Sequence, residues 1–168
     1  ERSPSHTLVT YGLGDVRIEE TKFITWDDRA VCSYRIRSTG KQAHTVDIEV
    51  LAPYLTMPNG DAAPAYPLLG SGTFQKIPVF VYLDAPGFSR SEGTAIHLRR
   101  SLTVAAESPT ASPVEAQVAV SFENQRRNGP TRALPADLFV RHQREYNRWF
   151  FDNVPYFDAA DPAFKKMW

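Results

Sequence analysis

The chain has 168 residues, a hydrophobic fraction of 42% and equal numbers of basic and acidic side chains, 19 of each. This length fits one domain with a substantial core, and the balanced charge argues against nucleic acid or an anionic membrane as a partner. No apolar run approaches the roughly 20 residues that cross a bilayer, and the lone Cys32 allows no internal disulfide. The compartment stays open, with a secreted or periplasmic location slightly favoured over the cytoplasm.

The first part of the chain shows the two-residue alternation of β-strands. Strands are predicted at 7–11, 15–25, 29–38 and 43–52. Phe23 falls out of phase with the apolar residues before it, so we expect a bulge or a strong twist near this position. The strands at 29–38 and 43–52 alternate cleanly, and the short glycine-containing loop between them predicts a β-hairpin.

A long segment rich in proline and glycine, from Pro53 to Lys76, is predicted to be a loop. Beyond it, alternation predicts strands at 77–83, 94–106 and 114–123, and Arg100 interrupts the apolar stripe of the second of these. The predicted strands number about seven, each with a polar face, and they do not alternate with helices. This pattern predicts a mainly β fold, an antiparallel β-sandwich (supersandwich-like) followed by a C-terminal linker helix.

After residue 128 the period of the apolar residues becomes helical. The apolar helix positions are Leu138, His142, Tyr146, Trp149 and Phe150, and Arg148 and Asp152 are spaced for a salt bridge. Asp161 and Pro162 open a second helix that stops at Trp168, too short to be stable alone. We therefore divide the chain into a β-sandwich domain, 1–128, and a helical linker with the start of a missing helical module, 129–168. Because the chain begins with Glu1 rather than Met, we also expect an upstream piece to be absent.

Two groups of acidic residues invite a catalytic or metal-binding interpretation. His44, Asp47 and Glu49 are close in sequence, but a strand places His44 on the opposite face from the two acids. A solvated outer face is therefore favoured, and no metal is predicted. Asp27 and Asp28 are interpreted as turn residues rather than as half of an acid/base pair, because adjacent turn residues rarely reach one substrate atom.

Two further motifs are interpreted as structural. Cys32 is in phase with apolar neighbours on its strand and is expected to be a small buried side chain rather than a nucleophile. The segment Gly70–Thr73 resembles a fragment of a phosphate-binding loop, but the rest of that motif is missing, so a turn is favoured. The sequence predicts no cofactor and no catalytic residue within this chain.

The aromatic residues near the C-terminus leave two interpretations open. Tyr146, Trp149 and Phe150 are followed by Tyr156 and Phe157. The favoured interpretation is that these rings are core, packed on the sandwich or on the missing module. The alternative is a carbohydrate platform, since flat rings with polar edges suit the apolar faces of sugars.

The end of the chain also resembles a known group of enzymes. A β-sandwich is followed by a helical linker, then by the segment Asn153–Asp158, and then by Asp161, Pro162 and Trp168. This order is similar to the segment that leads into the (α/α)6 barrel of inverting glycoside hydrolases. The group includes trehalase-like, mannosyl-oligosaccharide glucosidase-like and mannosylglycerate hydrolase-like enzymes. The resemblance rests on about the last 25 residues, including Trp149 and Phe157.

The resemblance implies a parent glycoside hydrolase in which two carboxylates of the barrel cleave the glycosidic bond. This chain would be its non-catalytic sandwich, packed on the (α/α)6 catalytic domain and shaping the cleft for a carbohydrate substrate. Side chains expected at the cleft rim are Tyr66, in the long loop, and Trp149 and Tyr156, at the aromatic junction. The alternatives are a free-standing module that binds carbohydrate or protein, and an adhesion- or transport-associated sandwich.

Overall fold

The computed structural model describes residues 5–26, 28–56, 68–90, 95–123 and 137–154. The chain divides into two compact units, Glu1–Pro135 and Ala136–Trp168, and each is described by itself. The predicted domain boundary at residue 128 lies outside the described residues. So do the terminal segment 155–168 and Asp27.

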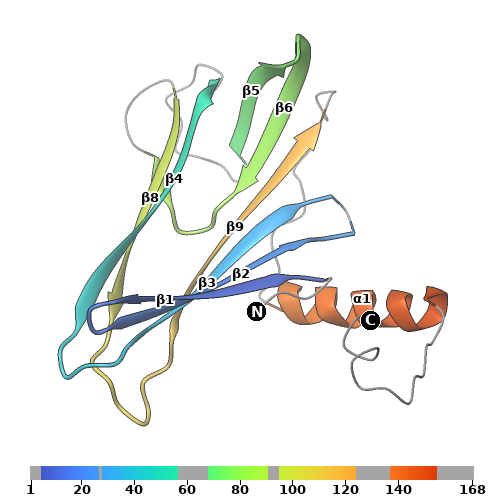
Figure 1. Cartoon of the computed structure of the whole chain (residues 1–168). Coiled ribbons are helices and arrows are strands. Elements are labelled where there is room, and N and C mark those ends of the chain that lie inside the picture. Colours follow the sequence, from blue (N-terminus) through green and yellow to red (C-terminus); the bar gives the residue numbers. More distant parts are fainter. Residues whose placement is uncertain (1–4, 27, 57–67, 91–94, 124–136, 155–168) are drawn as a thin grey trace. The chain divides into compact units, whose positions relative to one another are not determined.

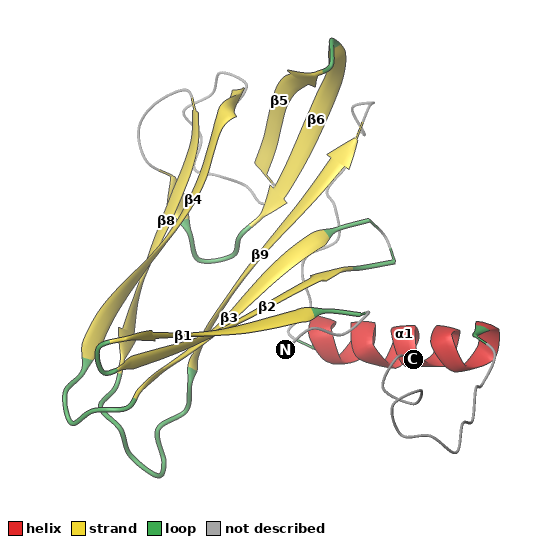
Figure 2. Cartoon of the chain, viewed as in Figure 1, coloured by secondary structure: helices red, strands yellow, loops and turns green. Residues whose placement is uncertain are grey.

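The described part of the first unit consists of β-strands, and the described part of the second is one α-helix (Figures 1 and 2). The elements are β1 (Thr7–Leu13), β2 (Val16–Ile24), β3 (Ala30–Ser38), β4 (His44–Thr56), β5 (Leu68–Phe74), β6 (Ile77–Asp84), β7 (Ser89–Arg90), β8 (Ala95–Val104), β9 (Val114–Glu123) and α1 (Leu138–Asn153). The predicted mainly β fold with a C-terminal helix is confirmed.

All strand pairs are antiparallel, and the hydrogen-bonded order is β1-β2-β3-β9-β6-β5-β4-β8-β7. Within the described residues, β5 and β4 are joined through one residue pair, Thr56 with Ser71. This narrow junction divides the strands into a sheet of six, β1-β2-β3-β9-β6-β5, and a sheet of three, β4-β8-β7. The two sheets form the predicted antiparallel sandwich.

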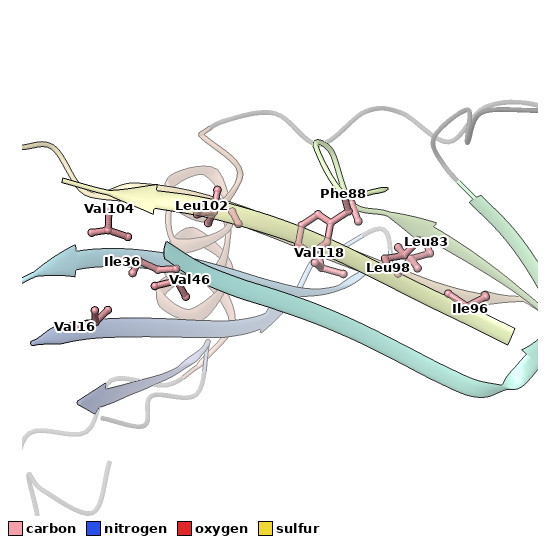
Figure 3. Packing of buried hydrophobic residues seen from close by; sticks show 12 residues of the cluster. Val16, Ile36, Val46, Leu83, Phe88, Ile96, Leu98, Leu102, Val104 and Val118 are labelled. Atoms are coloured by element: carbon pink, nitrogen blue, oxygen red, sulfur yellow. The ribbon is translucent and has the colours of Figure 1, made fainter. Parts of the chain in front are cut away.

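The core lies between the two sheets, where apolar stripes from both meet (Figure 3). Strand β8 supplies the largest share, and its four stripe residues are at most 5% exposed. They are Ile96, Leu98, Leu102 and Val104. Val46 of β4 lies in the same stripe, and the six-stranded sheet contributes Val16, Ile36 and Val118 from β2, β3 and β9. Because this packing covers one face of the strands that contribute to it, the two-residue period predicted those strands.

Arg100 occupies a core position in the stripe of β8, opposite Ile48 of β4. Its Nη1 donates a hydrogen bond to the carbonyl of Pro86 at 3.1 Å. The guanidinium lies against Gly87, whose φ of 80° is in the left-handed region that favours glycine. The charged end thus reaches the loop between β6 and β7 while the aliphatic part stays in the stripe, as long basic side chains commonly do.

The hairpin predicted for 29–38 and 43–52 is wrong. Strand β3 pairs with β2 and β9, whereas β4 pairs with β5 and β8, so the two strands belong to different sheets. Both have an apolar stripe, Ile36 in one and Val46 in the other, and both stripes enter the common core. Alternation shows which residues share a face, but two strands can share a core by facing each other as well as by pairing edges.

The short loop after β3 is tied down on both sides as the chain crosses between the sheets. The amide of Thr39 donates to the carbonyl of Asp15 at 2.7 Å, and the amide of Glu107 donates to the carbonyl of Gly40 at 2.8 Å. Ser38 Oγ also accepts from the amide of Gly40 at 3.1 Å. The loop is therefore held between the β1–β2 turn and the residues that follow β8.

The loop predicted for Pro53–Lys76 is wrong at both ends. Strand β4 continues to Thr56, and 68–74 form β5, paired along its length with β6. The turn predicted at Gly70–Thr73 is therefore a strand segment. Its glycines hide the alternation, and the apolar β6 supplies the partner that fixes it in the sheet. Residues 57–67 lie outside the described part.

Of the bulge or strong twist predicted near Phe23, the bulge is wrong. Pairing of β2 with β3 runs without interruption from Val16 to Ile24. Phe23 is out of phase because it is buried on the outer face of the six-stranded sheet, at 5% exposure, as is its neighbour Val31, at 1%. The irregularity in the described strands lies in β4, where the register shifts between Ala52 and Thr56, a stretch that contains Pro53.

The helix of the second unit, α1, confirms the helical period predicted there. Asp137 precedes it without a side-chain cap hydrogen bond, and the amide of Val154 donates to the carbonyl of Phe150 at its end. The predicted pair of Arg148 and Asp152 is present, with 3.8 Å between Nε and Oδ2. Both side chains are exposed, so this pair stabilises the helix weakly.

Replacement of Gly40 by alanine is expected to lower the free energy of unfolding by about 1–3 kcal/mol, the usual cost of an inserted methyl group without space. A Cβ on Gly40 would lie 2.8 Å from Cβ of Asp15, and this atom is attached directly to the backbone, so it cannot swing away as the end of a flexible side chain could. Urea unfolding measures the effect. Gly12→Ala is the matched control, because a Cβ there meets nothing within 4 Å, and an equal loss in both variants would contradict the crossing-loop argument.

The β5–β6 turn offers a stabilising change. Gln75 and Lys76 both have positive φ, 49° and 67°, which side chains other than glycine and asparagine rarely adopt. The double substitution Gln75→Asn with Lys76→Gly should raise the free energy of unfolding by roughly 1 kcal/mol. Thermal unfolding tests it. Thr110→Gly, in a turn without positive φ, should instead be slightly destabilising.

Candidate functional site

Of the three predicted rim residues, the structure describes one, Trp149. Tyr66 and Tyr156 lie outside the described residues. Trp149 lies in α1, 44% exposed, with its ring centroid 6.0 Å from that of Tyr146. The carbohydrate role of these side chains stays a prediction.

The aromatic stripe of α1 is graded along the helix. Leu138 and His142 near its start are buried, whereas Trp149 near its end is 44% exposed. Tyr146 stacks on Phe150 with ring centroids 6.2 Å apart. The rings thus support one another along the helix, and both the core and the platform interpretations remain open.

Asp47 and Glu49 belong to a charged outer face of the three-stranded sheet. Asp47 accepts hydrogen bonds from Ser101 and Arg99, and these two bonds, that of Ser101 first, hold its pKa below the ordinary range. Glu49 Oε2 lies 3.5 Å from Nε2 of His97. His44 is on the inner face, as predicted, and no group of three metal-ligating side chains occurs in the part of the chain that the structure describes.

Asp28 is a turn residue, as predicted, whereas Cys32 is less buried than predicted. Asp28 has a φ of 59° in the β2–β3 turn, and its amide donates to the carbonyl of Thr25 at 3.0 Å. Cys32 is half-buried in β3. Burial, and then the charge of Glu20, raise the pKa of its thiol, so Cys32 is a poor nucleophile at neutral pH.

The most developed polar arrangement that the structure describes was not predicted from the sequence. It lies on the inner face of β1, β2 and β3 and consists of Tyr11, Glu20, Lys22, Cys32 and Tyr34, here called the Glu20 cluster. Tyr11 donates its phenolic hydrogen to Oε2 of Glu20 at 2.7 Å, and Nζ of Lys22 lies 3.1 Å from the same oxygen. Tyr34, directly opposite Glu20 in the sheet, is hydrogen-bonded to it as well.

The electrostatics of the cluster keep its central carboxyl ionised. Glu20 is only 6% exposed, and burial alone would raise its pKa. The hydrogen bonds from Tyr11, Lys22 and Tyr34 outweigh burial and lower the pKa of Glu20 below its usual range. The same contact with Glu20 raises the pKa of Lys22, so the pair is a carboxylate and an ammonium at neutral pH.

The cluster has the chemistry of binding rather than of acid/base catalysis. A general acid needs a raised carboxyl pKa, whereas that of Glu20 is lowered. Burial raises the pKa of Tyr34 far above neutrality, so its hydroxyl stays protonated. One sequence signal did point here: Glu20 is an acid in phase with Val16 and Ile18. Its contact with Tyr11 depends on the β1–β2 register, which the alternation pattern does not give.

The fold of this chain is similar to part of a known protein structure. The chain has the mainly β architecture of two antiparallel sheets followed by a helix. A solved structure described as a candidate kojibiose phosphorylase from the human microbiome matches 86% of this chain with a TM-score of 0.55. The identity is 10%, so the similarity shows a shared fold alone, and the match spans 23% of that protein's chain. No family model and no curated protein matches the sequence.

The Glu20 cluster makes stability depend on pH in a defined direction. Because the folded pKa of Glu20 is lowered, its contribution is complete above the ordinary carboxyl value of about 4.3 and is lost as pH falls through the lowered value. Glu20→Ala should cost about 1–3 kcal/mol at pH 7, since it leaves polar partners unsatisfied, and less at acid pH. Urea unfolding from pH 7 to pH 3 measures this.

Glu19→Ala is the matched control for that prediction. Glu19 lies on the opposite face of β2 and pairs with two half-exposed arginines, Arg17 at 3.3 Å and Arg37 at 3.6 Å. Surface ion pairs contribute little, so this variant should lose less stability than Glu20→Ala. Equal losses in the two variants would contradict a special role for the inner-face carboxylate.

Proposed function

We propose that this chain is a non-catalytic β-sandwich domain of an enzyme that acts on glycosidic bonds, and that it packs on a helical catalytic domain. The observation that carries this proposal is the structural similarity of the chain to the N-terminal β-sandwich region of a kojibiose phosphorylase. The match covers 86% of this chain and 23% of the other. That proportion is expected when a domain of a larger enzyme is compared with the whole.

Two independent lines support the same class of enzyme. The resemblance in the sequence rests on about the last 25 residues, including Asn153, Asp161 and Trp168, whereas the structural match rests on the fold over 86% of the chain. Both indicate a carbohydrate-active enzyme with a sandwich ahead of a helical module. The first suggests hydrolysis and the second phosphorolysis; both reactions cleave a glycosidic bond, and they differ in whether water or phosphate accepts the sugar.

The charged groups of the sandwich support a non-catalytic role. The carboxylates that the structure places in clusters are neutralised by basic side chains: Asp47 by Arg99, Glu115 by Arg35, and Glu20 by Lys22. Glycoside cleavage requires one carboxyl with a raised pKa beside a second that is free to act as base or nucleophile. In the proposed enzyme this pair belongs to the helical domain, and Tyr66, Trp149 and Tyr156 contribute to the rim of its cleft.

Expression of the complete open reading frame that contains this chain, beside the chain alone, tests the proposal. We expect the complete protein to release glucose or glucose 1-phosphate from an α-linked glucose disaccharide, and the chain alone to release neither. Dependence on inorganic phosphate separates phosphorolysis from hydrolysis. Turnover by the chain alone, or a reading frame that encodes no helical module, would overturn the proposal.

A further inference from the structure

The Glu20 cluster lies where the inner face of the six-stranded sheet becomes open. Exposure along the inner face of β2 rises from 5% at Val16 to 66% at Ile24, and the side chains of Glu20 and Lys22 between them are 8% and 50% exposed. Tyr11, on the neighbouring β1, is 45% exposed. The cluster therefore has a buried carboxylate at its base and an accessible ammonium and phenol ring above it.

The accessible groups retain hydrogen-bonding capacity after their contacts with Glu20. An ammonium carries three donors, and one of those on Lys22 is directed at Oε2 of Glu20. Tyr11 donates its phenolic hydrogen to the same oxygen, which leaves the phenolic oxygen free to accept. A bound molecule would therefore find donors on Lys22 and an acceptor on Tyr11, side by side on the open face.

The charge and shape of the cluster define the class of molecule that suits it. Glu20 and Lys22 cancel, so the cluster attracts neither an anion nor a cation by net charge. The half-exposed ring of Tyr11 offers a flat apolar surface with a polar edge. A neutral molecule with several hydroxyl groups and an apolar C–H face satisfies all three conditions, and a pyranose sugar is such a molecule.

We propose that the Glu20 cluster is a binding subsite for a neutral saccharide. The choice of a saccharide over other neutral polyols rests on the proposed function. Lys22 and Tyr11 contact the sugar hydroxyls, the ring of Tyr11 stacks on the sugar, and Glu20 positions both. Such a subsite would hold substrate on the sandwich near the enzyme that uses it.

The test is a titration of the full isotope-labelled 168-residue chain with kojibiose and with glucose, followed by nuclear magnetic resonance. We expect saturable shifts at the side chains of Tyr11 and Lys22, with roughly tenfold weaker binding in Tyr11→Ala, the loss of about one good contact. Tyr11→Phe keeps the ring and should weaken binding less. Arg17→Gln, on the opposite face of β2, should leave the affinity unchanged.

Two outcomes would sink the subsite. The first is the absence of shifts at Tyr11 and Lys22 in the unchanged chain, which does not depend on whether any variant folds. The second is sugar-induced shifts confined to other residues, or inorganic phosphate binding at Lys22 in place of the sugar. Because the proposed function is tested by turnover of the complete protein and the subsite by binding to this chain, either can fail without the other.

Discussion

The sandwich depends on the burial of one apolar stripe, that of β8. This strand belongs to a sheet of three, with β4 on one side and the two-residue β7 on the other. Full burial of one large aliphatic side chain stabilises a fold by about 1.5–3 kcal/mol, and the stripe holds four of them. The six-stranded sheet provides the opposing surface through Ile36 and Val118 (Figure 3), so neither sheet is complete without the other.

The unequal size of the two sheets accounts for the rest of the burial pattern. At the Val16 end of β2 the inner face is buried, whereas at the Ile24 end it is exposed and the outer-face Phe23 is buried instead. The strand thus exchanges its covered face along its length without a break in register. The Glu20 cluster lies at this transition, where the buried carboxylate of Glu20 is bonded to the half-exposed Lys22 and Tyr11.

The chemistry of the described sandwich follows from how its charges are used. On the outer faces Asp47 and Glu115 are paired with arginines, and Glu20 on the inner face is paired with Lys22 and two phenols. A carboxylate held in this way is a poor proton donor but a good fixed partner for its neighbours. Paired charges of this kind suit binding and structural support better than proton transfer.

The sequence by itself determined the strands with strong alternation, the helical period of α1 and the faces on which His44 and Asp47 lie. These features are local, because a side chain's face depends on the two-residue or 3.6-residue period of its own element. Tertiary structure alone decided that β3 and β4 lie in different sheets and that the glycine-rich segment 68–74 is a strand. It also brought Tyr11 to Glu20. The partners and register of a strand are set by the surface against which the strand is buried, and the local sequence pattern does not specify that surface.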